Sequence, residues 1–167
     1  CFEDPDITHV EGSVDPIRDI EIINLELIMA DLQTVENRLA KVERKAQTNK
    51  DKDAMAEVAV LKKIKDALEA EKPARSVELD KDELAIVKAF SLLTLKPVIY
   101  VANMSDEDIM DPESNPLYQK VKAFAAAENS HVVPVCAKIE EELSGLDKEE
   151  KAEFLKELGI AESGLDQ

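Results

Sequence analysis

Two short polar motifs follow apolar runs in the second half of the chain. Asn103–Asp106 (NMSD) comes after "KPVIYVA", and Cys136–Lys138 (CAK) comes after "HVVPV". An asparagine amide can bridge a ring nitrogen and the exocyclic amine on one edge of adenine. An aspartate carboxylate accepts hydrogen bonds and therefore suits the two adjacent donors of guanine. These residue types favour a purine-binding edge, and an ordinary exit from a strand into a loop is the alternative.

The elements around the motifs would bring them together. "VIYVA" is β-branched and continuously apolar, as expected of a strand that is covered on both faces. "SHVVPVCA" indicates a second strand, in which Pro134 favours an edge or an interruption. Between them, "SNPLYQKVKAFAAAEN" predicts a helix with Pro116 near its start. The order strand, helix, strand, helix indicates parallel strands, whose carboxyl ends collect ligands. Both motifs fall at those ends.

The first half of the chain predicts a helical hairpin. Asp15 can cap a helix that has Pro16 at its first position. An apolar seam at heptad spacing follows, formed by Leu25, Ile28, Leu32, Val35, Leu39 and Val42. After the polar break "QTNKDKDA", a second apolar stripe is formed by Val58, Leu61, Ile64 and Leu68. Because neither helix would be stable alone, we expect the two to pack as an antiparallel coiled-coil hairpin.

Two further helices are predicted beyond the hairpin. "ELDKDELAIVKAFSLL" begins with a capping box, in which Asp80 is followed three residues later by Glu83, and this helix ends before Pro97. "GLDKEEKAEFLKELG" predicts a last helix that stops at Gly159.

The charge of the chain is distributed unevenly. The net charge of −16 argues against nucleic acid as a default partner, and we expect no sequence-specific binding to DNA. Residues 31–72 nevertheless hold nearly equal numbers of basic and acidic side chains, and five basic ones gather near the hairpin tip: Lys41, Arg44, Lys45, Lys50 and Lys52. One interpretation is a solvated coiled-coil surface. The other is a docking arm for an anionic partner such as ribosomal RNA.

Composition narrows the remaining classes of function. No apolar stretch reaches membrane-spanning length, so we expect no membrane partner. Two cysteines, Cys1 and Cys136, are too few for a disulfide scaffold, which favours a reducing cytoplasm. Neither histidine has a metal-ligand partner at a workable spacing, and no metal site is predicted within the chain.

The stretch "CFEDPDITHVEGSVDPIRDIEIINLEL" resembles the segment that opens the helical domain of the YchF/Obg-like ATPase family, in the translation-factor-related class of P-loop GTPases. The resemblance continues through "KPVIYVANMSDED" and "VPVCAKIEEEL" and covers essentially the whole chain. It implies a nucleotide-binding domain interrupted by a coiled-coil hairpin and followed by a TGS domain. It also implies hydrolysis of ATP or GTP with Mg²⁺, and a cytoplasmic role at the ribosome, on the large subunit or the 70S particle.

The resemblance assigns roles to six residues. It implies that Asn103 contacts the purine edge, that the Met104 backbone reads the ring, and that Ala137 and Lys138 line the base pocket together with Cys136. In the family the guanine-reading motif N-K-x-D is altered to N-x-x-E, which favours ATP. Met104 replaces the lysine as the family pattern expects, whereas Asp106 stands in place of the glutamate and leaves the choice between ATP and GTP open.

The family's phosphate-binding motif G-x-x-x-x-G-K-[ST] does not occur in this sequence. We therefore expect an internal fragment without the TGS domain, inactive by itself, with Mg²⁺ ligands outside the chain. The expected fold is α/β, a partial P-loop NTPase sheet with the hairpin inserted. Its parts would be the end of a strand and an entry loop at 1–15, the hairpin at 16–78, and the base-recognition half at 79–167. The alternative function is a non-catalytic hairpin module that docks on protein or ribosomal RNA.

Overall fold

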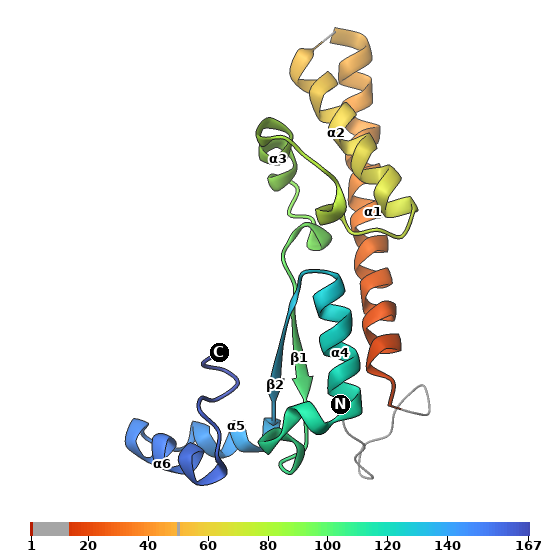
Figure 1. The fold of residues 1–167 in the computed structure, drawn as a ribbon. Helices are drawn as coiled ribbons and strands as arrows, with labels where there is room; N and C mark the ends of the chain where they lie inside the picture. Colours follow the sequence, from red (N-terminus) through yellow and green to blue (C-terminus); the bar gives the residue numbers. More distant parts are fainter. Residues whose placement is uncertain (2–13, 50) are drawn as a thin grey trace. The chain divides into compact units, whose positions relative to one another are not determined.

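The computed structural model describes residues 1, 14–49 and 51–167, which belong to two units. Ile20–Pro97 form a helical unit. Cys1–Asp19 together with Val98–Gln167 form a second unit around two parallel strands (Figure 1). Helices predominate in the described part of the chain.

Two long helices dominate the helical unit. α1 (Pro16–Asn49) begins at Pro16 as predicted, and Asp15 Oδ1 accepts a hydrogen bond from the N–H of Arg18 at 3.2 Å. α2 (Lys52–Glu69) is capped by Asp51, whose carboxylate accepts from the N–H groups of its second and third successors. Most of the predicted seam is buried, but Leu25 near the start of α1 is exposed.

Ion pairs along α1 and α2 define how the two helices run. Glu36 of α1 pairs with Lys65 of α2, and Glu43 pairs with Lys62. The later residue of α1 thus meets the earlier residue of α2, so the helices run in opposite directions. The supercoiling of a true coiled coil stays a prediction.

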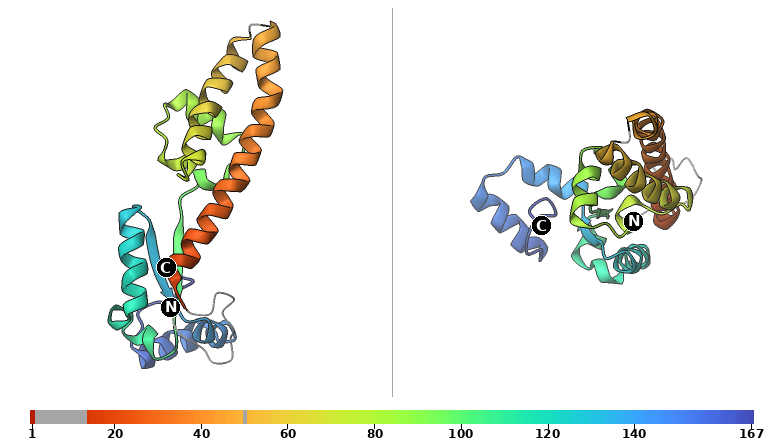
Figure 2. Two further views of the ribbon diagram at one scale, coloured as in Figure 1. Left: turned by 90° about the vertical axis from the view of Figure 1, so that its right-hand side faces the viewer. Right: turned by 90° about the horizontal axis from the view of Figure 1, so that it is seen from above.

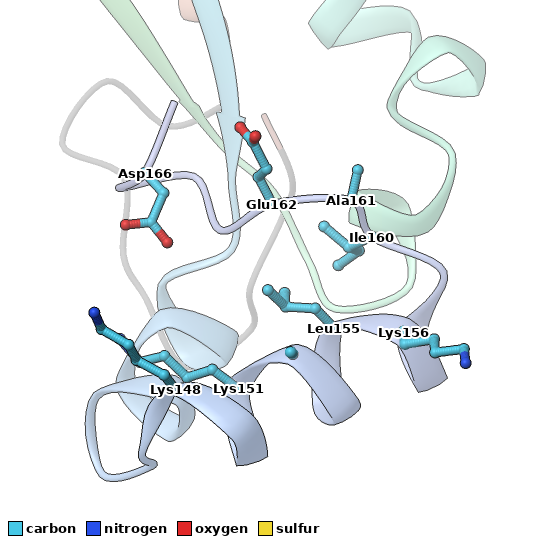
Figure 3. Close-up of a pocket in the computed structure, with 9 residues that line it drawn as sticks. Lys148, Lys151, Leu155, Lys156, Ile160, Ala161, Glu162 and Asp166 are labelled. Atoms are coloured by element: carbon cyan, nitrogen blue, oxygen red, sulfur yellow. The ribbon is translucent and has the colours of Figure 1, made fainter.

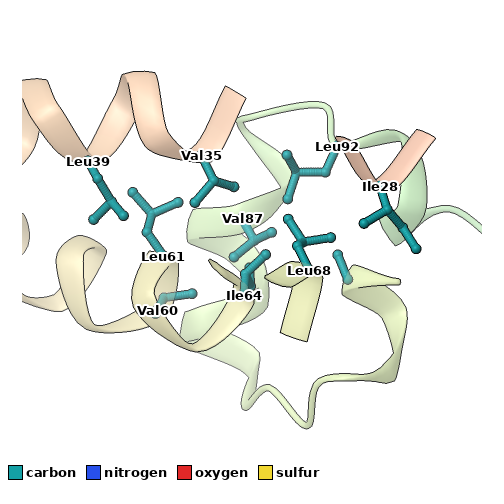
Figure 4. Close-up of a cluster of buried hydrophobic side chains, with 10 residues drawn as sticks. Ile28, Val35, Leu39, Val60, Leu61, Ile64, Leu68, Val87 and Leu92 are labelled. Atoms are coloured by element: carbon teal, nitrogen blue, oxygen red, sulfur yellow. The ribbon is translucent and has the colours of Figure 1, made fainter. Parts of the chain in front are cut away.

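The core of the helical unit extends beyond the hairpin (Figure 4). Val87 of α3 (Lys81–Lys88) and Leu92 are buried in the same cluster as the apolar stripes of α1 and α2. The other buried members are Ile28, Val35, Leu39, Val60, Leu61, Ile64, Leu68 and Ala74. α3 thus contributes to the hairpin core and lies in the same compact unit, which extends to Pro97. The domain bounds 1–15, 16–78 and 79–167 stay a prediction.

Buried Asp31 of α1 explains why the third helix is shorter than predicted. α3 ends at Lys88, and Ser91 takes a positive φ of 52°. Asp31 Oδ1 then accepts from the N–H of Leu93 at 2.8 Å. Asp31 Oδ2 accepts from the N–H and the hydroxyl of Thr94, at 2.7 and 2.6 Å. These N–H groups are satisfied by a distant carboxylate instead of by helical bonds.

The second unit contains the predicted parallel strands. β1 (Ile99–Asn103) pairs with β2 (His131–Val135) in a register that runs from Ile99 opposite His131 to Asn103 opposite Val135. α4 (Pro116–Ala127) connects them and packs on the sheet, with Tyr100 of β1 in edge-to-face contact with Phe124. The order strand, helix, strand, helix is confirmed.

The prediction that β1 is buried on both faces is wrong for the described residues. Ile99 and Val101 are 64% and 63% exposed, whereas Ala102 is buried. Side chains alternate along a strand, and α4 packs on the face that carries Tyr100 and Ala102. Ile99 and Val101 point to the opposite face.

α5 (Ala137–Ser144) and α6 (Lys148–Leu158) follow β2 at the carboxyl ends of the strands (Figures 1 and 2). Asp147 and Glu150 form a capping box at the start of α6, and Gly159 ends it with φ 72°, as predicted. Ile139 and Leu143 of α5 and Leu155 of α6 form a small core together with Cys136. Among the described helices, none combines the length and the apolar character that a membrane span requires.

Candidate purine-binding site

Asn103 and Ala137 meet at the carboxyl end of the sheet. Asn103 is the last residue of β1 and pairs with Val135, the last residue of β2. Ala137, the first residue of α5, lies two positions after Val135. Asn103 Oδ1 accepts a hydrogen bond from the Ala137 N–H at 3.4 Å. The parallel register thus places the two predicted motifs side by side, and Asn103 and Ala137 are both exposed there.

Asp106 and Lys138 form the second link between the motifs. Lys138 Nζ donates to Asp106 Oδ2 at 2.9 Å. The hydrogen bond from Lys138, followed by one from the Asp106 backbone N–H, lowers the pKa of the Asp106 carboxyl. The same bond, with the attraction of the carboxylate charge, raises the pKa of Lys138. At neutral pH the site therefore holds an ionised pair.

Met104 has a different position from its neighbours in the motif. Its side chain is 1% exposed and packs with Ala102 and Tyr118. Its N–H donates to the carbonyl of Val135 at 2.7 Å, which continues the strand pairing. The Met104 N–H is therefore used in strand pairing, and a contact between the Met104 backbone and the purine ring stays a prediction. The side chain of Met104 anchors the loop to the unit's core.

Cys136 is also buried, in the cluster that it forms with side chains of α5 and α6. It occupies the N-cap position of α5 but makes no capping hydrogen bond with its side chain. Its contribution to the site is to pack, and thereby to hold Ala137 and Lys138 at the surface. Of the six predicted site residues, Asn103, Asp106, Ala137 and Lys138 are thus exposed together.

Two residues outside the prediction shape the loop after β1. Ser105 Oγ accepts from the N–H of Asp108 at 3.1 Å, which closes a tight turn. Buried Asn115 donates to Asp108 Oδ2 at 3.1 Å and accepts from the N–H groups of Leu117 and Tyr118 at the start of α4. The sequence "SNP" carries a helix-cap signal, because asparagine before proline is typical of a helix start. The tie from Asn115 to the loop has no such local signal.

The basic side chains of the predicted docking arm lie around the junction of α1 and α2. Lys41, Arg44 and Lys45 of α1 and Lys52 of α2 are exposed. None of these four forms an ion pair with another described residue. Lys50, the fifth member of the prediction, lies outside the described residues.

Two hollows of the second unit are not lined by the exposed residues of the candidate site. One, of about 210 Å³, is lined by Cys136, Ile109, Pro134 and the segment after α6. The other, of about 610 Å³, lies against α6, with Lys148 and Lys151 on the same side as Asp166 (Figure 3). Within residues 1, 14–49 and 51–167, no three His, Cys, Asp or Glu side chains form a cluster that could hold a metal ion.

Comparison with known proteins places the whole chain alongside one group of relatives. No protein-family model matches the sequence. The chain is 55% identical over 167 residues to the ribosome-binding ATPase YchF of Bacillus subtilis (strain 168), covering 100% of this chain and 45% of that protein. It is 46% identical to the protein of the same name from Haemophilus influenzae, again covering 100% of this chain and 45% of that protein.

A solved structure shares the fold. The Schizosaccharomyces pombe YchF GTPase superimposes with a TM-score of 0.82 and 32% sequence identity, covering 98% of this chain and 44% of the other. The chain therefore spans somewhat less than half the length of the relatives it matches.

Proposed function

Because the chain belongs to the YchF family, we propose that it supplies the base-binding part of a purine-nucleotide site in a cytoplasmic ATP- or GTP-hydrolysing protein. The observation that carries this proposal is the convergence of Asn103 with Ala137 and of Asp106 with Lys138 at one sheet edge. Ligands of open α/β sheets typically bind at the carboxyl ends of parallel strands, and four exposed polar or backbone groups lie at that place here.

Asn103 and Asp106 each have a chemical task in this proposal. The Asn103 side-chain oxygen already accepts from Ala137, which orients its amide group so that Nδ2 can donate to a purine ring nitrogen. Asp106 offers carboxylate oxygens to donors on the base edge. Because both groups are exposed, the base would be read at the surface of this unit.

The phosphates would be held by other parts of the protein. This sequence contains no Gly-rich phosphate-binding loop, and its described acidic residues form no metal cluster. The named relatives are more than twice as long. In this proposal, phosphate binding, Mg²⁺ coordination and attack by water therefore depend on residues beyond the 167 of this chain.

Nucleotide titration tests the base site. We expect Asn103→Ala, in a protein of the relatives' length that contains this chain, to weaken ATP or GTP binding about tenfold, because one direct hydrogen bond is lost. Asn37→Ala, which removes an exposed amide from the helical unit, is the matched control. Unchanged affinity in Asn103→Ala would contradict the assignment.

A second candidate function is docking of the α1–α2 hairpin on the ribosome. The relatives from Bacillus subtilis and Haemophilus influenzae are named ribosome-binding ATPases. The specific observation in this chain is the exposed group Lys41, Arg44, Lys45 and Lys52, which lacks ion pairs with described acidic residues. Exposed cations without acidic partners suit phosphate contacts, each of which releases counterions.

Salt-dependent binding to ribosomes tests this docking. Changing these four residues to glutamine should weaken co-sedimentation with 70S ribosomes and flatten its dependence on salt concentration. The control removes an equal charge from the other unit, at Lys120, Lys148, Lys151 and Lys156. Equal binding of both variants would remove the docking assignment and leave the base site unaffected.

A further inference from the structure

Lys138 occupies a position that the stability of its own helix does not explain. It is the second residue of α5, where the positive end of the helix dipole disfavours a cation. Its ammonium lies 2.9 Å from Asp106 Oδ2, on a loop 32 residues earlier in the chain. Both side chains are largely exposed, and an exposed ion pair adds little to folding stability. The geometry therefore points to a role for this pair in the site.

The ion pair changes what Asp106 offers to a base. An ionised carboxylate has only acceptor sites, and an ammonium has only donors. Guanine presents two neighbouring donors, the ring N1–H and the 2-amine, and these match a carboxylate with both oxygens available. Adenine presents an acceptor at N1 beside its 6-amine donor. A carboxylate without a partner would repel the N1 lone pair, whereas a carboxylate beside an ammonium offers one acceptor and one donor.

From this chemistry we infer that Lys138 is a specificity-determining residue that acts through Asp106. By occupying Oδ2 and neutralising the carboxylate, it weakens the preference for guanine and makes the site accept adenine. This inference rests on the proposed purine site and goes beyond it by assigning base choice to the Asp106–Lys138 pair. It also explains how an aspartate at this position is compatible with binding of an adenine nucleotide.

Calorimetric titration with ADP, GDP and IDP tests the inference, in a protein of the relatives' length that contains this chain. Lys138→Met should shift the ratio of GDP to ADP affinity about tenfold toward GDP, since a charge-assisted hydrogen bond is redistributed. GDP should also gain more than IDP, because inosine lacks the 2-amine that the second carboxylate oxygen would accept. Lys138→Arg keeps the cation and should keep the wild-type ratio.

A double substitution separates this role from a general effect on binding. In an Asp106→Asn background, Lys138→Met should no longer change the ratio, because no carboxylate is left to be released. Lys122→Met, which breaks a comparable exposed pair with Glu113 in the same unit, is the control and should leave the ratio unchanged. Thermal unfolding of each variant reports whether the unit remains folded.

The possible outcomes are distinct. A shifted ratio in Lys138→Met, absent in Lys138→Arg and abolished by Asp106→Asn, supports the inference. Equal loss of ADP and GDP affinity, or an unchanged ratio, overturns it while the purine site stands. A wild-type protein that binds neither nucleotide overturns the proposed function and this inference with it.

Discussion

Asn103 and Ala137 are 34 positions apart in the chain, and the side-chain oxygen of Asn103 accepts a hydrogen bond from the Ala137 N–H at 3.4 Å. The link uses the oxygen of the amide and leaves the other half, Nδ2, available to donate to a different partner. In the proposed site that partner is the purine. The two halves of the amide can therefore be tested separately.

Asn103→Asp isolates the donor half of this amide. The carboxylate can still accept from Ala137, but it cannot donate to a purine ring nitrogen. We expect purine nucleotide affinity to fall at least as far as in Asn103→Ala, about tenfold or more, because the new charge also faces a ring lone pair. Calorimetric titration measures the affinity.

Circular dichroism and the urea midpoint serve as the control for Asn103→Asp. Both should match the wild type, since residue 103 is exposed and keeps its bond to Ala137. Wild-type affinity in this variant would contradict a donor role for Asn103.

Asp31→Asn should destabilise the helical unit. Asp31 is 2% exposed and accepts three hydrogen bonds, from the Leu93 N–H and from the N–H and hydroxyl of Thr94. The asparagine amide would place a donor against one of these donors, so the free energy of unfolding should fall by about 2 kcal/mol. Urea denaturation followed by circular dichroism measures the change.

Glu36→Gln is the matched control for Asp31→Asn, because Glu36 lies on the same helix in a loose surface ion pair. Its urea midpoint should stay close to that of the wild type. Equal effects of the two substitutions would show that the buried contacts of Asp31 contribute no more to stability than the surface ion pair of Glu36.

The Asp106–Lys138 pair should have a measurable acid limit. Hydrogen bonding to Lys138 holds the pKa of Asp106 below its ordinary value of 3.8. The ionised carboxylate therefore contributes to the stability of the folded unit above pH 3.8, and this contribution is lost as the pH falls through the lowered pKa. The pKa of Lys138 is raised above its ordinary value of 10.5. The stability that its ammonium contributes is therefore fully present below pH 10.5 and is lost as the pH rises through the raised pKa. The pair is therefore intact at neutral pH.

Carbon-13 NMR of the Asp106 carboxyl checks this directly. The titration midpoint should lie below 3.8 in the wild type and should rise in Lys138→Met. A midpoint that does not move when Lys138 is replaced would show that the ion pair is not populated in solution.

Gly164→Ala should loosen the segment after α6. A Cβ at this position would lie 2.5 Å from Val135 Cγ2, and the Gly164 N–H donates to Glu140 Oε1 at 2.6 Å. Valine is branched and held in the strand, so the clash should cost about 1–3 kcal/mol. Hydrogen exchange of residues 160–167 measures the loss of protection.

Gly145→Ala is the control for Gly164→Ala. Its added Cβ would meet nothing closer than 3.9 Å, and Gly145 has ordinary right-handed helical backbone angles. Protection and stability should stay at wild-type levels or rise slightly. Wild-type exchange in Gly164→Ala would show that the segment does not pack against β2.

Much of the local structure could be predicted from the sequence. Asp15 and Pro16 at the start of α1 and Gly159 after α6 act as predicted, and Asp80 caps α3 by accepting from the Glu83 N–H. These features depend on residues within one or two turns of each other, so a short stretch of sequence contains all the interacting groups. The alternation of strands and helices likewise predicted the parallel pairing that brings Asn103 beside Ala137.

The predictions that failed concern burial and long-range partners. Val101 was predicted to lie in a strand covered on both faces, and it is exposed. A side chain's burial depends on what packs over its face, and the sequence near a strand does not specify that. The third predicted helix ended early for the same kind of reason, because Asp31 binds the N–H groups of Leu93 and Thr94.

The sequence by itself thus determined the alternation of strands and helices, the helix ends that depend on local caps, and the residue types at the candidate site. Only the tertiary structure decided that Lys138 occupies the Asp106 carboxylate and that the Met104 N–H is used in strand pairing. A hydrogen bond forms only when donor and acceptor come within about 3 Å at a suitable angle. For residues 32 positions apart, as Asp106 and Lys138 are, that proximity is a property of the folded chain and not of either motif.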